Sequence, residues 1–313
     1  MQIENRTVPR KYLNITMENE SVIKSIFYNL TGIFSVLFVL TGTLIGYPFL
    51  LAASLIKLIP FKPSQKICTK LLIMIATRWI DNNTFLCKRI LCIKVKVSGD
   101  TDLPMKEWYL VISNHQSWSD IVVLQMVFNG RIPLLKFFLK KELIWVPLLG
   151  IAWWALDFPF MKRYSVDFIA KYPHLKGKDI EITKKACEKF STIPVTVMNF
   201  VEGTRFTEEK HKRQKSPFKN LLKPKAGGTG FVLTAMGHQL HSILNVTIKY
   251  PGGDKHFWNF ICGRINEVDL FIEKIPVTND LVGDYVSDPE YQGRFKKWIN
   301  DLWTKKDKVF EEM

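Results

Sequence analysis

Cysteine is scarce, and the few cysteines present are not spaced like metal ligands. The 313-residue chain has five, an odd number, and none forms a C-x-x-C pair. This spacing excludes the usual zinc sites and gives no support to a disulfide framework, so reduced thiols and no metal are predicted. The first 24 residues mix acids with bases and lack the apolar run of a secretory signal peptide.

Acidic residues are also few relative to basic ones. The chain has 44 Lys and Arg against 29 Asp and Glu, a net charge of +15. Such an excess predicts an anionic partner, either nucleic acid or an anionic phospholipid membrane. The longest basic stretch, Lys210–Lys215, is expected in a loop and does not cluster with aromatic residues. The membrane is therefore the predicted partner, and nucleic acid is not.

Charged residues are missing altogether from Ser25 to Ile56, a run of 32 residues. One helix of that length would measure about 48 Å, more than the ~30 Å hydrocarbon core requires. Gly46-Tyr47-Pro48 is predicted to interrupt it. Either one helix spans and a second lies at the interface, or the two form a hairpin within one leaflet. Basic residues on both flanks favour a cytoplasmic location for both ends and for the C-terminal body.

The predicted organisation has four parts. Residues 1–24 form a polar segment and residues 25–59 the membrane segment. Residues 60–80 combine apolar residues at helical spacing with lysines, which predicts either an amphipathic helix in the headgroup region or a helix packed on the body. Residues 81–313 form an α/β domain.

Short apolar runs alternate with helical stretches after residue 90. This pattern predicts an α/β fold with a mixed, largely parallel sheet flanked by helices, in which ligands bind beyond the carboxyl ends of strands. The predicted strands are Leu91–Val97, Trp108–Ser113, Leu134–Leu139, Phe158–Met161, Val195–Phe200, Ile243–Lys249 and Val268–Ile275. The predicted helices are Ser119–Phe128, Val146–Leu156, Lys178–Phe190, Gly227–Gly237 and Glu290–Phe310.

The first candidate motif, Asn114-His115-Gln-Ser-Trp-Ser-Asp120, follows one predicted strand and precedes a helix that Ser117 or Ser119 is expected to cap. Across such a turn, Asp120 can reach one imidazole nitrogen of His115 and leave the other free to take a proton from a hydroxyl. No G-x-S-x-G elbow is present, so the pair would act on the substrate's own hydroxyl. The spacing alone also fits a structural turn histidine. His174 and Asp179 share this spacing but lie in a polar loop, and they are not predicted to be catalytic.

The second candidate motif is Phe200-Val-Glu-Gly-Thr-Arg-Phe206, directly after another predicted strand. A Gly203–Thr204 turn would let the backbone approach a ligand. Arg205 can bind a phosphate through two parallel hydrogen bonds, and Glu202 would bind a hydroxyl or hold Arg205. The alternative is a surface turn with an incidental ion pair.

Further basic residues follow other strands or precede a helix. Lys140 and Arg163 each come just after a predicted strand, and with Arg205 they would form a phosphate pocket at one edge of the sheet. Lys225 and Gly227 open a predicted helix, whose N-terminus favours anions, and are candidate contacts for the donor or a phosphate. The glycines fit neither a dinucleotide fingerprint nor a P-loop.

Taken together and in their order along the chain, the motifs between residues 108 and 250 resemble those of the lysophosphatidic acid acyltransferase family (1-acylglycerol-3-phosphate O-acyltransferases). The family's catalytic N-H-x4-D block maps onto His115 and Asp120, and its F-P-E-G-T-R block, associated with the acceptor's glycerol phosphate, looks like Phe200–Arg205. Its other basic blocks resemble Lys140 and Arg163, and its last strand resembles Val246–Pro251. The departures are Val201 for proline, Phe206 for serine and Asp157 for glycine. The runs Lys140–Gly150, Phe160–Arg163 and Glu202–His211 look more like the longer membrane-bound branch of the family.

The resemblance implies transfer of a fatty acyl group from acyl-CoA or acyl carrier protein to the free hydroxyl of a lysophospholipid, with no cofactor. His115 would be the base, and lysophosphatidic acid the acceptor. Three alternatives stay open: another acceptor such as lysophosphatidylinositol, a membrane-bound thioesterase that uses the same pair on water, and a non-catalytic basic scaffold. The C-terminal stretch Phe295–Phe310 is expected to pack on the domain as a helix instead of contacting the membrane.

Overall fold

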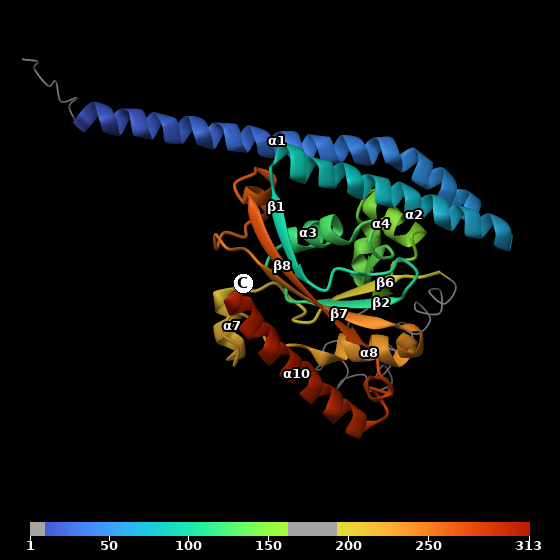
Figure 1. The fold of residues 1–313 in the computed structure, drawn as a ribbon. Coiled ribbons are helices and arrows are strands. Elements are labelled where there is room, and N and C mark those ends of the chain that lie inside the picture. Colours follow the sequence, from blue (N-terminus) through green and yellow to red (C-terminus); the bar gives the residue numbers. More distant parts are fainter. Residues whose placement is uncertain (1–9, 162–192) are drawn as a thin grey trace, which may run out of the picture.

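The computed structural model describes residues 10–161 and 193–313. A long antiparallel helix pair lies along one side of a layered α/β body (Figure 1). The predicted helix Lys178–Phe190, together with Arg163, His174 and Asp179, lies outside the described residues.

The main sheet is mixed and largely parallel, which confirms the predicted fold class. Its order is β1 (Lys94–Gly99), β8 (Glu267–Pro276), β7 (Ser242–Lys249), β2 (Tyr109–Ser113), β6 (Thr196–Phe200) and β3 (Leu135–Phe137). Strands β7, β2, β6 and β3 run parallel, whereas β8 is antiparallel to β7 and pairs in parallel with β1. A second sheet pairs β4 (Leu139–Lys140) with β5 (Phe160–Met161), so the predicted strand Leu134–Leu139 is divided in two.

Strand β2 lies at the centre because all five of its residues are apolar or small and all are buried. Tyr109 and Val111 point to the face covered by α3 (Ser119–Phe128). Leu110 and Ile112 point to the opposite face, covered by α8 (Ala226–Met236) and α10 (Pro289–Glu312). Burial on both faces is typical of a strand inside a parallel sheet, and it fixes the position of the loop that follows β2.

The helices on the two faces lie close to where their sequences predict them. Helix α3 has the predicted bounds. Helix α10 begins where the Asp288 carboxylate accepts hydrogen bonds from the N–H groups of Glu290 and Tyr291, both at 3.0 Å. Its apolar stripe is buried against α8 and the sheet, so the predicted packing on the domain is confirmed. The shorter helices are α4 (Leu149–Ala155), α7 (Glu208–Gln214) and α9 (Phe257–Ile261).

The predicted interruption at Gly46-Tyr47-Pro48 is wrong. Helix α1 runs without a break from Arg10 to Lys57 with Pro48 inside it. A proline removes one backbone donor and bends a helix without necessarily ending it, and Figure 1 shows α1 curving toward its C-terminal end. Helix α2 (Lys62–Phe85) returns alongside it, and the Trp79 indole donates a hydrogen bond to the Thr43 hydroxyl at 3.0 Å.

Helix α1 also packs on the body at points far apart along its length. A Cβ placed on Gly32 would lie 2.6 Å from Cys262 Sγ, so only glycine allows α1 to approach the end of α9 this closely. At the other end, Lys57 donates to the Asp157 carboxylate at 2.5 Å. Asp157 stands where the resembled family commonly has glycine, and its φ of +58° is the left-handed backbone that glycine favours. Its carboxylate therefore attaches the end of α1 to the body.

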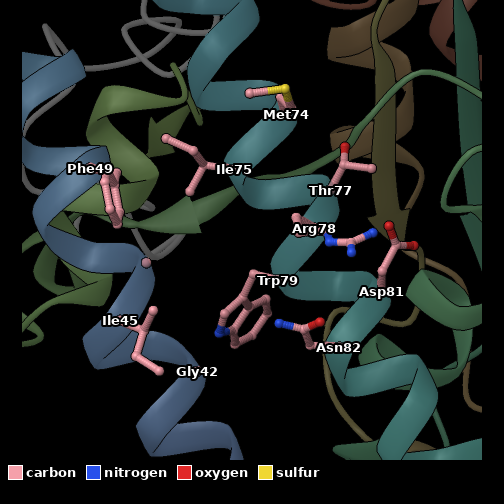
Figure 2. A pocket seen from close by; sticks show the side chains of 11 residues that line it. Gly42, Ile45, Phe49, Met74, Ile75, Thr77, Arg78, Trp79, Asp81 and Asn82 are labelled. Atoms are coloured by element: carbon pink, nitrogen blue, oxygen red, sulfur yellow. The ribbon is translucent and has the colours of Figure 1, made fainter.

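A cavity of about 600 Å³ lies between α1 and α2. Figure 2 shows Ile45 and Phe49 of α1 on one side and Ile75 and Trp79 of α2 on the other, with Arg78 nearby. None of the predicted site residues lines it. By length and composition, one helix in the described part of the chain, Val22–Lys57, could cross a membrane.

The basic stretch Lys210–Lys215, expected in a loop, is mostly the helix α7. The Thr207 hydroxyl accepts a hydrogen bond from the Lys210 N–H at 3.2 Å, and Glu208 and Glu209 occupy the first turn. Lys215 ends the helix in the left-handed conformation. Because this helix has no buried residue, its sequence lacks the apolar periodicity that would have indicated it.

Candidate active site

Two loops meet at the carboxyl edge of the sheet because β2 and β6 are parallel neighbours with Ser113 opposite Phe200. The Val201 N–H donates to the Ser113 carbonyl at 3.2 Å, and the Phe206 N–H donates to the His115 carbonyl at 2.7 Å. The two sequence motifs therefore form one continuous surface.

His115 and Asp120 form the predicted pair. The His115 Nδ1 atom lies 2.8 Å from Asp120 Oδ2, and the imidazole stacks on the Phe200 ring with centroids 3.9 Å apart. Asp120 is fully buried and His115 is 9 % exposed. The His115 Nε2 atom has no hydrogen bond to any residue that the structure describes. The imidazole is thus oriented on one side and available to a substrate on the other.

The Asp120 carboxylate is held by four donors. Besides His115, the N–H groups of Gln116 and Ser117 donate to Oδ2 at 2.6 and 2.9 Å, and the Tyr250 hydroxyl donates to Oδ1 at 2.7 Å. Burial and the nearby Asp120 charge raise the pKa of Tyr250 well above its ordinary value, so the phenol stays a donor. Sequence reasoning did not find Tyr250, although its place just after β7, beside β2, could have indicated it.

The turn around His115 differs in detail from the predicted cap. No side chain caps α3: its N-cap position is Trp118, and the Ser117 hydroxyl accepts from the Ser119 N–H at 3.1 Å. The Asp120 carboxylate instead accepts hydrogen bonds from the N–H groups of Gln116 and Ser117 in the turn itself. The Asn114 amide completes the arrangement by exchanging two hydrogen bonds of 2.9 Å with the backbone of Ile248 in β7.

Glu202 does not hold Arg205, contrary to one prediction, and its position leaves no room for a phosphate contact. Its side chain is fully buried. One carboxylate oxygen accepts from the His115 N–H and the other from the Leu222 N–H, both at 3.0 Å. Burial raises the pKa of Glu202 to about 8, against the lowering effect of these two donors and of the Lys306 charge. Glu202 therefore fixes the backbone of the residue that carries the imidazole.

Lys306 of α10 lies behind Glu202 and was not found from the sequence. It is buried, and its ammonium donates to the Val246 carbonyl and, at 3.4 Å, to the Thr247 hydroxyl. Burial lowers the pKa of Lys306 to about 7, while the charges of Glu202 and Glu273 oppose this shift. The helix that covers the sheet thus places a cation within electrostatic reach of Glu202.

The loop from Gly203 to Arg205 faces outward. Gly203 has a φ of +68°, and a Cβ there would lie 3.1 Å from Cδ of Lys225, so the lysine side chain lies directly over this turn. The Lys210 ammonium donates to the Thr204 hydroxyl and to the Arg205 carbonyl, both at 2.9 Å. The Arg205 guanidinium stands 4.2 Å from the centroid of the Trp118 ring. This cation–π contact joins the two motifs and leaves the guanidinium without an ion pair among the described residues.

Other predicted site residues are not brought to this loop. Lys140 is exposed at the end of β4, in the two-stranded sheet, with no contact to the His115 turn among the described residues. Arg163 lies outside those residues. Gly227 faces Phe231 and Tyr285, on the side of α8 that packs toward α10, so its predicted contact with donor or phosphate has no support in the structure.

Residues 94–241 match the family model described as Acyltransferase. This span contains His115, Asp120 and the whole loop from Glu202 to Arg205. This part of the chain, a little under half of its length, is therefore similar to the acyltransferase family. The chain is also similar to 1-acyl-sn-glycerol-3-phosphate acyltransferases, which confirms the resemblance predicted from the motifs.

Three relatives illustrate the similarity. The chain is 24 % identical to 1-acyl-sn-glycerol-3-phosphate acyltransferase epsilon of Mus musculus, over 67 % of this chain and 60 % of that protein. It is 24 % identical to 2-acyl-1-lysophosphatidylinositol acyltransferase of Saccharomyces cerevisiae, over 66 % and 62 %, and 31 % identical to the human alpha acyltransferase, over 41 % and 39 %. The chain thus spans less than two thirds of the length of these relatives. The crystal structure of the 1-acyl-sn-glycerophosphate (LPA) acyltransferase PlsC from Thermotoga maritima aligns with a TM-score of 0.49 at 18 % identity, covering 90 % of this chain and 98 % of that one.

Proposed function

We propose that this protein transfers a fatty acyl group from an acyl thioester, carried by coenzyme A or acyl carrier protein, to the free hydroxyl of a lysophospholipid. The observation that carries the proposal is the His115–Asp120 pair at the carboxyl edge of the sheet, with Nε2 free and Arg205 on the adjoining loop. A base next to an unpaired guanidinium suits a substrate that has both a hydroxyl and a phosphate.

The proposed reaction uses His115 twice. Nε2 takes the hydroxyl proton as that oxygen forms a bond to the thioester carbonyl carbon, and Asp120 stabilises the imidazolium. The carbon–sulfur bond then breaks, and the proton passes to the departing thiolate. The N–H groups of Gln116 and Ser117 already donate to Asp120, whereas the Trp118 N–H has no hydrogen bond within the described chain. We assign the Trp118 N–H to the oxyanion of the tetrahedral intermediate.

We propose lysophosphatidic acid as the acceptor, with phosphatidic acid as the product. The similarity to acyltransferases named for 1-acyl-sn-glycerol-3-phosphate supports this choice. A second candidate acceptor is lysophosphatidylinositol, because a relative of similar identity and coverage is named for that reaction. Both acceptors have a hydroxyl and a phosphate on one glycerol backbone, so His115 and Arg205 would bind either of them.

In purified membranes carrying the protein, we expect labelled oleoyl-coenzyme A to yield phosphatidic acid when lysophosphatidic acid is supplied. Arg205→Ala is expected to lower kcat/KM for the acceptor roughly 10- to 100-fold, because it removes a charge-assisted hydrogen bond to the phosphate. Product analysis with both lysophospholipids in parallel measures this and identifies the preferred acceptor.

The matched control is Arg213→Ala, which removes an exposed arginine from α7 outside the two loops. A thioesterase would instead release free oleate at a rate that Arg205→Ala leaves unchanged, and a scaffold would give no turnover with either acceptor. Either result would refute the proposal.

The helix pair is proposed to attach the body to the cytoplasmic leaflet with α1 lying along the membrane surface. The Ser25 and Ser35 side chains contact Arg264 and the Ile261 carbonyl, and Lys57 contacts Asp157. These contacts are spread over 32 residues, or about 48 Å of helix. A helix crossing the ~30 Å hydrocarbon core could not keep both ends on the same polar body. The exposed apolar residues on the rest of α1 would face the acyl chains.

This arrangement leaves the N-terminal segment on the cytoplasmic side. The segment contains glycosylation acceptor sequences at Asn5-Arg6-Thr7, Asn14-Ile15-Thr16 and Asn19-Glu20-Ser21. We expect no glycosidase-sensitive mass shift when the protein is made with microsomes. A fusion carrying the same segment behind a cleaved signal peptide is the positive control and should be modified. Modification of the unfused protein would show that α1 spans the bilayer.

A further inference from the structure

Lys255 is a half-buried cation next to the His115 turn that belongs to neither sequence motif. It lies in the loop between β7 and α9. Its ammonium donates to the Gln116 side-chain oxygen at 3.0 Å and stands 4.4 Å from the centroid of the Phe206 ring. Gln116 directly follows His115, and the Phe206 N–H donates to the His115 carbonyl. The lysine therefore contacts both motifs at residues adjoining the proposed base.

Among the described residues the ammonium of Lys255 directly contacts only neutral groups, while the carboxylates of Glu208, Asp120 and Glu202 act on its charge without touching it. Within residues 10–161 and 193–313 it forms no ion pair, and its neighbours are an amide oxygen and an aromatic face. A lysine ammonium has three donors, of which one is used by Gln116. Burial lowers the pKa of Lys255, and the charges of Glu208, Asp120 and Glu202 oppose this shift. An anionic oxygen at this point would accept hydrogen bonds from the remaining donors and place a negative charge in direct contact with the ammonium.

The position of Lys255 is fixed at both ends of the residue. The Phe206 ring is the face on which the ammonium rests. The backbone of the lysine is fixed independently, because the Ser117 hydroxyl donates to the Lys255 carbonyl at 2.5 Å. Lys255 and Arg205 are thus arranged alike, each cation on an aromatic ring of the two loops.

We infer that Lys255 is a further substrate-binding residue, which contacts the phosphate of the lysophospholipid acceptor together with Arg205. The inference rests on the proposed function. The phosphate is preferred over the donor's phosphates because only a few covalent bonds separate it from the hydroxyl that His115 would deprotonate. When the acceptor hydroxyl lies at His115, its phosphate must therefore lie close by, where Arg205 and Lys255 can bind it.

The test compares Lys255→Met, Lys255→Arg and Lys249→Met with the wild type in the membrane assay. Methionine keeps the length of the chain and the backbone carbonyl but removes the charge. Lys249→Met is the matched control, because it also removes a lysine from an aromatic ring, Phe310, at the far face of the sheet. We expect Lys255→Met to raise KM for lysophosphatidic acid roughly 10- to 100-fold with little change in kcat or in KM for oleoyl-coenzyme A. Lys255→Arg should stay within a few-fold of wild type.

A neutral acceptor separates binding from structure. Monoacylglycerol has a free hydroxyl but no phosphate, so Lys255→Met should leave its slow acylation unchanged. An equal loss with monoacylglycerol, a change in the KM of the donor alone, or a fall in kcat with both KM values unchanged would overturn the inference. The wild-type reaction is measured first. If the wild type gives product and Lys255→Met has the same kcat and KM values, the inference about Lys255 fails while the proposed function stands. Absence of wild-type product refutes the proposed function itself.

Discussion

Replacement of His115 by alanine is expected to lower acyl transfer roughly 10²- to 10⁴-fold, the range typical of a general base. The imidazole is the group with an unoccupied nitrogen at the carboxyl edge of the sheet, and Asp120 fixes its other nitrogen at 2.8 Å. Alanine leaves the Glu202 and Phe206 contacts intact, since both go to the His115 backbone. The fold and the binding of substrate should therefore survive. Initial rates with saturating donor and acceptor measure the effect.

His238→Ala is the matched control for this experiment. His238 is exposed and lies before β7, at the edge of the sheet opposite to His115. Its replacement removes a histidine without touching the site, so activity should equal that of wild type. If His115→Ala retained most of the rate while remaining folded, His115 would be a structural turn histidine and the proposed mechanism would be wrong.

The sequence was sufficient to predict which segments meet at the site. The strand before each motif was predicted to within one residue, and α3 was predicted with its observed bounds. Apolar runs of about five residues followed by polar motifs indicate buried parallel strands, and such strands bring their carboxyl ends to one edge. The pairing of His115 with Asp120 follows from this arrangement, because both residues lie on one short turn.

What the sequence did not predict depends on contacts across long sequence separations. The sequence predicts that Glu202 binds a substrate hydroxyl or holds Arg205, and the resemblance adds a phosphate contact, yet its carboxylate accepts hydrogen bonds from the N–H groups of His115 and Leu222. Tyr250, just after β7, and Lys306, in α10, reach the site from more than 100 residues away from Asp120. The continuity of α1 through Pro48 likewise depends on packing against α2 and the body, which outweighs the local preference of proline.

Glu202→Gln is expected to lower kcat roughly 10²-fold although it replaces neither His115 nor Asp120. Above pH 8, where Glu202 is ionised, its carboxylate accepts two backbone N–H groups, from His115 and Leu222, both at 3.0 Å, so the kinetic comparison is made above that pH. Glutamine offers one oxygen and one NH₂ group, so one buried N–H would lose its acceptor, at a cost of about 1–3 kcal/mol. A displacement of about 1 Å in a reacting group is sufficient for such a loss of rate. The kcat and KM of the variant measure it, with Glu209→Gln as control, since Glu209 is exposed on α7.

The same substitution should change how stability depends on pH. Burial raises the pKa of Glu202 from 4.5 to about 8, so between these values the folded protein keeps a proton that the unfolded chain has lost. Stability contributed by this group therefore falls as pH rises through that window. Lys306 acts in the opposite direction, because its pKa is lowered from 10.5 to about 7 and stability rises with pH between those values. In detergent-solubilised protein, the thermal midpoint of wild type should fall between pH 5 and 7, and that of Glu202→Gln should fall less. An equal fall in both proteins would show that another buried group titrates in this range.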